Sequence, residues 1–275
     1  MATSVHERVH HELDTTATPQ AARESLKRAA EAVAQSTYDG RLDWSQYRLG
    51  DADLTALIAE SVQLGVARHT RVLDLFYNNL STVPETLMPA FASLEQLLLG
   101  CNPLSRLSRA SLPAGLQLLD VGYSENLAHL PDDIFEGLQQ LRELRAGCNR
   151  LQHLPASLFD ADRGCASSLE HLEVYGNHLE GLPDSIGNLR RLRVLNLGRN
   201  QLQMLPRRLA ELPALQVLQL YDNDLRLPLP VEYASANAFP QLRELVWRGN
   251  VHLPSVPREC ERLGARQVIR FWAST

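Results

Sequence analysis

The chain has 275 residues, 44% of them hydrophobic, with a formal net charge of -5 and a sequence pI near 6.0. This acidic balance argues against nucleic acid or an anionic membrane surface as the main partner. No apolar run approaches the roughly 18 residues that cross a bilayer, and the first residues lack the apolar segment of a secretory signal.

The N-terminal region is predicted to have two parts. Residues 1–17 are polar and rich in His and Thr, which predicts a disordered tail. Residues 18–40 are predicted to form a helical cap, because Thr18 can cap a helix and Pro19 suits its first position. The apolar stripe of this helix suits a cover over the first coil of a repeat array, although a targeting or partner-binding segment would show the same pattern.

One phrase recurs from residue 41 to residue 257. Two clear copies are LEHLEVYGNHLEGLP at 169–183 and LRVLNLGRNQLQMLP at 192–206. Their LxL core alternates as a short strand does, and an asparagine follows where the strand would end. An amide side chain has two donors and an acceptor, so these asparagines are predicted to satisfy buried backbone groups rather than bind a ligand. They are Asn78, Asn102, Asn149, Asn177, Asn200, Asn223 and Asn250, with Ser124 at the remaining expected position.

Both ends of the repeat array depart from the phrase. Residues 41–64 are a degenerate first coil whose second half has helical spacing. Residues 258–275 are predicted to be a C-terminal cap, with a closing helix that presents Leu263, Val268, Ile269 and Trp272. Because terminal coils must cover an apolar face, atypical ends are what we expect of a complete solenoid.

The consensus LxxLxLxxNxLxxLPxxL resembles the leucine-rich repeat of the typical intracellular kind, over roughly residues 40–260. The resemblance implies an α/β solenoid: a right-handed, curved horseshoe of about nine coils with a concave parallel β-sheet and helical caps. It also implies protein–protein interaction through the concave face by a monomer, although a fold does not by itself specify a function.

Composition and the signal-free N-terminus are also similar to those of leucine-rich repeat effectors that plant-associated bacteria deliver by type III secretion. Two alternatives therefore stay open: a secreted bacterial effector acting on host proteins, and an adaptor of a ubiquitin-ligase or signalling complex. The predicted location is the cytoplasm, or outside the producing cell by a route without a cleavable signal peptide, ending in the host cytoplasm for an effector.

The sequence contains no Gly-rich phosphate loop, no GxSxG and no HExxH phrase, so we predict no catalysis, no cofactor and no metal site. The four cysteines are scattered. Cys101 and Cys148 share a repeat position two coils apart, about 10 Å at roughly 4.7–4.9 Å per coil, which exceeds the roughly 7 Å limit for a disulfide. Free thiols in a reducing compartment are predicted.

The variable positions of the phrase identify the outward side of the sheet as the candidate binding surface. Tyrosine and arginine are enriched at binding hot spots. We expect the aromatic residues to be apolar anchors and the charged residues to pair with groups of opposite charge on a partner. The alternative is that the tyrosines are simply good strand residues and the charges only solvate the sheet. The predicted partner-binding residues are Asp74, Phe76, Tyr77, Asp120, Tyr123, Arg145, Glu173, Tyr175, Arg199, Tyr221, Asp222 and Arg248.

Overall fold

The computed structural model of the chain describes residues 18–257, 261 and 264–275. The predicted tail at 1–17, Cys260 and Leu263 lie outside the described residues.

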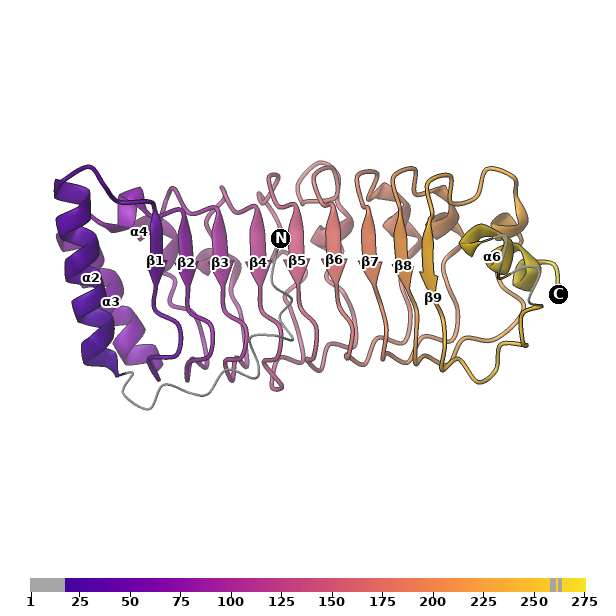
Figure 1. Cartoon of the computed structure of the whole chain (residues 1–275), viewed down its shortest axis with the longest axis horizontal. Helices are drawn as coiled ribbons and strands as arrows, with labels where there is room; N and C mark the ends of the chain where they lie inside the picture. The colour runs from indigo at the N-terminus through magenta and orange to yellow at the C-terminus, as the bar shows by residue number, and fades with distance from the viewer. Residues whose placement is uncertain (1–17, 258–260, 262–263) are drawn as a thin grey trace.

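One parallel sheet of nine strands runs along the molecule in sequence order (Figure 1). Each strand has three residues and pairs with the next coil without a shift in register. This arrangement confirms the predicted leucine-rich repeat solenoid. The strands are β1 (Arg41–Asp43), β2 (Val72–Asp74), β3 (Gln96–Leu98), β4 (Leu118–Asp120), β5 (Glu143–Arg145), β6 (His171–Glu173), β7 (Val194–Asn196), β8 (Val217–Gln219) and β9 (Glu244–Val246).

The core lies between the sheet and the short helices of the return segments. The middle residue of every strand is a leucine that is at most 8% exposed. The return segments carry α3 (Asp51–Gln63), α4 (Leu87–Ala90) and six 3-10 helices: η1 (Ala67–His69), η2 (Arg109–Ser111), η3 (Ala156–Phe159), η4 (Asp184–Asn188), η5 (Arg207–Glu211) and η6 (Val231–Ala234). A proline precedes each of η3 to η6, and its restricted φ ends the extended segment where the return begins.

A longer helix lies at each end of the array (Figure 1). At the N-terminal end, Thr18 caps α2 (Pro19–Ala34) by accepting a hydrogen bond from the amide of Ala21, and α2 contacts α3. At the other end, α6 (Ala265–Ala273) buries Trp272, whose indole meets that of Trp247 edge to face at 5.5 Å. No helix in the described part of the chain is long and apolar enough to cross a membrane.

The asparagine row joins neighbouring coils as predicted. Asn200 is 8% exposed, and its amide nitrogen donates to the carbonyls of Val174 in the preceding coil and Leu197 in its own, both at 3.0 Å. Its amide oxygen accepts from the backbone N–H of Leu179, also at 3.0 Å. The side chain therefore satisfies buried backbone groups on two coils.

Ser124 interrupts this row. Among the described residues, its hydroxyl donates to the carbonyl of Val121 at 3.2 Å, within its own coil. The amide of Leu104 in the preceding coil donates instead to the backbone carbonyl of Asn102 at 2.8 Å. This junction is held by fewer side-chain bonds between coils than its neighbours.

Candidate functional site

The outward side of the sheet has the rows of residues that the phrase predicts. In β5 to β8 only the middle residue is buried, and the first and third point away from the core. The register places Arg145, Glu173, Asn196 and Gln219 side by side. We call this side, with the turn residues that follow each strand, the concave face.

The residue before each asparagine position has a left-handed backbone. That conformation costs most residues roughly 1–2 kcal/mol and favours glycine, yet glycine stands at few of these positions. The row, with φ between 52° and 84°, is Gln46, Tyr77, Cys101, Tyr123, Cys148, Gly176, Arg199, Asp222 and Gly249. This left-handed conformation was not predicted from the sequence, although the two glycines in the row are a signal of it.

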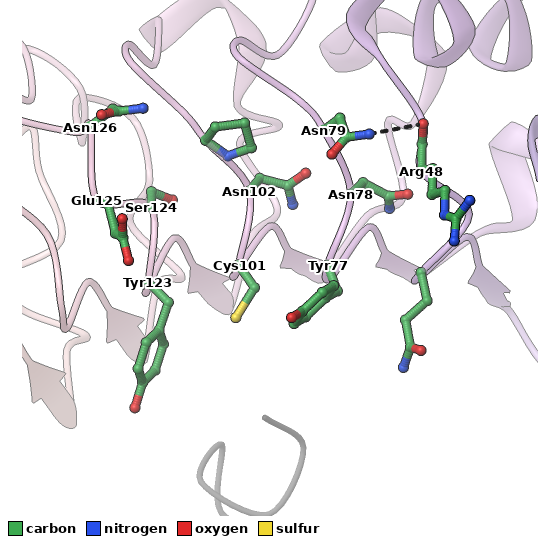
Figure 2. Close-up of a pocket in the computed structure, with 12 residues that line it drawn as sticks. Arg48, Tyr77, Asn78, Asn79, Cys101, Asn102, Tyr123, Ser124, Glu125 and Asn126 are labelled. Atoms are coloured by element: carbon green, nitrogen blue, oxygen red, sulfur yellow. Dashed lines mark hydrogen bonds between the residues drawn. The ribbon is translucent and has the colours of Figure 1, made fainter. Parts of the chain in front are cut away.

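A groove of about 610 Å³ lies beside the first four members of this row. Figure 2 shows Tyr77, Cys101 and Tyr123 pointing the same way from successive coils. The amide of Asn79 reaches the carbonyl of Arg48 at 3.4 Å. The groove is lined by Gln46, Arg48, Tyr77, Asn78, Asn79, Cys101, Asn102, Pro103, Tyr123, Ser124, Glu125 and Asn126.

Two tyrosines form a hydrogen-bonded pair at the middle of the concave face. The hydroxyls of Tyr123 and Tyr175 are 2.6 Å apart, and their rings meet edge to face with centroids 6.4 Å apart. The Tyr175 ring covers Gly147, where an added Cβ would lie 2.5 Å from its Cε1. Burial raises the pKa of both phenols, so both stay neutral donors at physiological pH.

Other aromatic rings of the face also cover glycines. Tyr221 covers Gly198, and Phe76 covers Gly100 from the coil before. We expected these rings to be anchors for a partner, and the structure shows that they also fill the space that a missing side chain leaves. Phe76 is only 5% exposed. Because it is buried, Phe76 is not part of the surface that a partner could contact.

A carboxylate cluster surrounds Arg145. The guanidinium donates to Glu143 from Nη2 at 2.6 Å and Nε at 2.7 Å, and lies 3.8 Å from Asp120. Glu173 is the neighbouring residue on β6. Burial raises its pKa, which Arg145 opposes and the carboxylates of Glu143 and Asp120 reinforce. Arg145, which we expected to pair with a partner, is already paired within the chain.

Two other predicted acidic residues, at the ends of strands β2 and β4, are buried rather than exposed on the open surface. Asp74 is 2% exposed, pairs with Arg41 at 2.6 Å and accepts a hydrogen bond from the amide of Phe76. Asp120 is 4% exposed and accepts from the amide of Gly122 at 3.0 Å. Their burial makes them poor contacts for a partner, contrary to the expectation from the register.

The remaining predicted charges lie toward the C-terminal coils. Arg199 and Asp222 form an ion pair at 3.6 Å with side chains 68% and 54% exposed, so the pair contributes little stability and both groups stay accessible. Arg248 is exposed and makes no ion pair with the described residues. The accessible members of the predicted set are thus Tyr77, Tyr123, Arg145, Glu173, Tyr175, Arg199, Tyr221, Asp222 and Arg248.

Comparison with known proteins agrees with this architecture. A family model described as leucine rich repeat matches residues 167–225. A leucine-rich repeat protein of Leptospira interrogans has a similar structure, with a TM-score of 0.63 and 25% identity over 88% of this chain and 66% of that one. The plant peptide hormone receptor RGFR1, solved in complex with RGF2, has a TM-score of 0.55 and 28% identity over 68% of this chain and 30% of the receptor. No curated protein matches the chain in sequence. The chain spans less than two thirds of the length of either solved structure.

Proposed function

We propose that this chain is a leucine-rich repeat interaction module that binds a protein or peptide partner through its concave face. The observation that carries the proposal is the tyrosine pair, Tyr123 and Tyr175, held at the middle of that face. A ring fixed before binding loses little conformational freedom on contact, so more of its contact energy appears as affinity. Support also comes from the peptide hormone receptor of similar fold, which was solved in complex with RGF2.

The proposal includes no catalytic role. A cysteine nucleophile acts as its thiolate, and burial raises the pKa of the Cys148 thiol and raises that of Cys101 to about 12. Both thiols therefore stay protonated at neutral pH, which favours recognition over chemistry at this face.

Partner capture with matched surface variants tests the proposal. The protein and its Tyr175→Ala, Tyr221→Ala and Met204→Ala variants are used to capture proteins from lysates of candidate source and host cells, with identification by mass spectrometry. Met204 is 74% exposed, lies outside the strands, and is the control. We expect a partner whose recovery falls with both tyrosine variants and not with the control, while circular dichroism shows all chains folded. Equal recovery with all four proteins would contradict the assignment.

The two narrower functions remain proposals with their own tests. For a type III effector, residues 1–36 fused to a reporter should be exported by a competent bacterium, and a fusion that stays inside counts against this function. For a ubiquitin-ligase or signalling adaptor, the captured partners should include members of that pathway, and their absence counts against it.

A further inference from the structure

The middle of the concave face has two neighbouring carboxylates, Glu143 and Glu173, beside the guanidinium of Arg145. His171, half-buried on the same strand as Glu173, also lowers the pKa of Glu173, but burial outweighs both cations and raises that pKa. Because Arg145 directs both Nε and Nη2 at Glu143, the Glu173 carboxylate receives no hydrogen bond or close ion pair from the described residues. A half-buried carboxylate among other carboxylates is unfavourable until a cation approaches it.

The groups beside Glu173 suit an organic cation. Tyr175 follows Glu173 by two residues on the same side of the sheet, and its ring is held over Gly147 by Tyr123. Tyrosine rings attract ammonium and guanidinium groups within about 6 Å of the ring centroid. A metal ion fits less well, because no group of three His, Cys, Asp or Glu side chains in the described part of the chain is arranged to hold one.

The outward strand residues of β7 and β8 are uncharged, and the Arg199–Asp222 pair lies in the turns that follow these strands. Val194 and Val217 are paired neighbours in β7 and β8, and Asn196 and Gln219 are paired beside them. All four are half-buried. A partner segment that lies across these strands therefore meets charge at β5 and β6, and apolar or amide groups beyond.

On the strength of the proposed function, we propose that the partner is a peptide segment that places one lysine or arginine side chain against Glu173 and Tyr175, and uncharged residues along β7 and β8. The charge complementarity of the sheet face is the argument for this occupant. Acidic and neutral segments lack a cation to place against Glu173. The experiment below compares the binding of basic, neutral and acidic segments.

The probe is an array of 12-residue peptides with randomised uncharged sequences and one fixed central residue. That residue is lysine, arginine, norleucine or glutamate, so the sets differ in charge and, for lysine and norleucine, hardly in shape. The full-length protein is compared with Glu173→Gln, which removes the charge and keeps the side-chain volume. Glu180→Gln, at an exposed loop residue, removes the same charge elsewhere.

We expect the lysine and arginine sets to be enriched among the binders. Glu173→Gln should weaken their binding about tenfold, and Glu180→Gln should leave it unchanged. The inference would be overturned if as many binders came from the norleucine set, or if most came from the glutamate set. If Tyr175→Ala abolishes the binding of those peptides, the proposed function still holds. If no set binds, the inference fails, and lysate capture with the tyrosine variants decides the proposed function independently.

Discussion

A methyl group added at Gly147 tests how the candidate site is built. Its Cβ would lie 2.5 Å from Cε1 and 2.8 Å from Cδ1 of Tyr175. Non-bonded carbons prefer about 3.5–4.0 Å, so Gly147→Ala should push the ring outward by roughly 1 Å. The displaced ring loses its 2.6 Å hydrogen bond and its edge-to-face contact with Tyr123.

The expected loss of stability is small because two effects oppose each other. The hydrogen bond and the aromatic contact each contribute about 0.5–1.5 kcal/mol, together about 1–3 kcal/mol. The backbone at Gly147 is not left-handed, so alanine fits it, and the stiffer unfolded chain returns about 0.4–1 kcal/mol. The net destabilisation should be about 0–2.6 kcal/mol, which leaves the protein folded and the tyrosine pair broken.

Urea unfolding and partner binding measure the two consequences separately. Gly181→Ala is the control, since an added Cβ there meets nothing within 4 Å. We expect Gly147→Ala to lose binding and Gly181→Ala to keep it with equal or higher stability. In a Tyr175→Ala background the clash is absent, so Gly147→Ala should no longer destabilise the protein. Undiminished binding by Gly147→Ala, or the same destabilisation in both backgrounds, would refute the reasoning.

Four further predictions concern single residues. Asn200→Ala should lower the free energy of urea unfolding by about 3 kcal/mol, because it leaves buried backbone groups on two coils without partners; a change below 1 kcal/mol would contradict this role. Ser124→Asn should raise the same free energy by about 1 kcal/mol by restoring bonds between coils, and an unchanged value would show that this junction has no room for them. Glu173→Gln should raise the melting temperature at pH 7, because the pKa of Glu173 is raised in the folded state and its ionisation therefore weakens the fold. The difference between the two proteins should vanish below about pH 4, where glutamate is neutral in both the folded and the unfolded state. A lower melting temperature of the variant at pH 7 would contradict this prediction. Cys101, whose pKa burial and then Asp120 raise to about 12, should react with iodoacetamide at pH 8 far more slowly in the folded protein than in urea, as followed by mass spectrometry.

The fold could be predicted from the sequence because its signals are local and repeated. A leucine pair with one residue between them sets both strand and facing direction, and the asparagine after it can bond only where two turns meet. Repetition at a nearly constant spacing then stacks these units into one sheet. The helix after Thr18 followed the same logic, since a capping side chain and Pro19 mark a start without reference to tertiary contacts.

The site could be predicted only in part, because the register says which side a residue faces and not how deeply it lies. Asp74 and Asp120 face outward in the sequence pattern. In the structure, each side chain accepts a hydrogen bond from the backbone N–H two residues later and is buried. Arg145 likewise faces outward but is drawn to Glu143 on its own strand. Such contacts depend on side-chain torsions, which a periodic pattern does not encode.

Contacts between coils complete the site. Because of these contacts, its aromatic residues both stabilise the solenoid and are available for binding. Tyr175 can lie over the neighbouring coil only because that coil has Gly147. The glycine lacks a side chain, and the ring of the next repeat packs in the space that this leaves. The same pairing occurs between Tyr221 and Gly198. A ring that fills such a gap adds packing and is also fixed in place, which is the property that a binding anchor needs. The pairs of glycine and aromatic residues on adjacent coils therefore locate the preorganised part of the concave face better than the aromatic residues do alone.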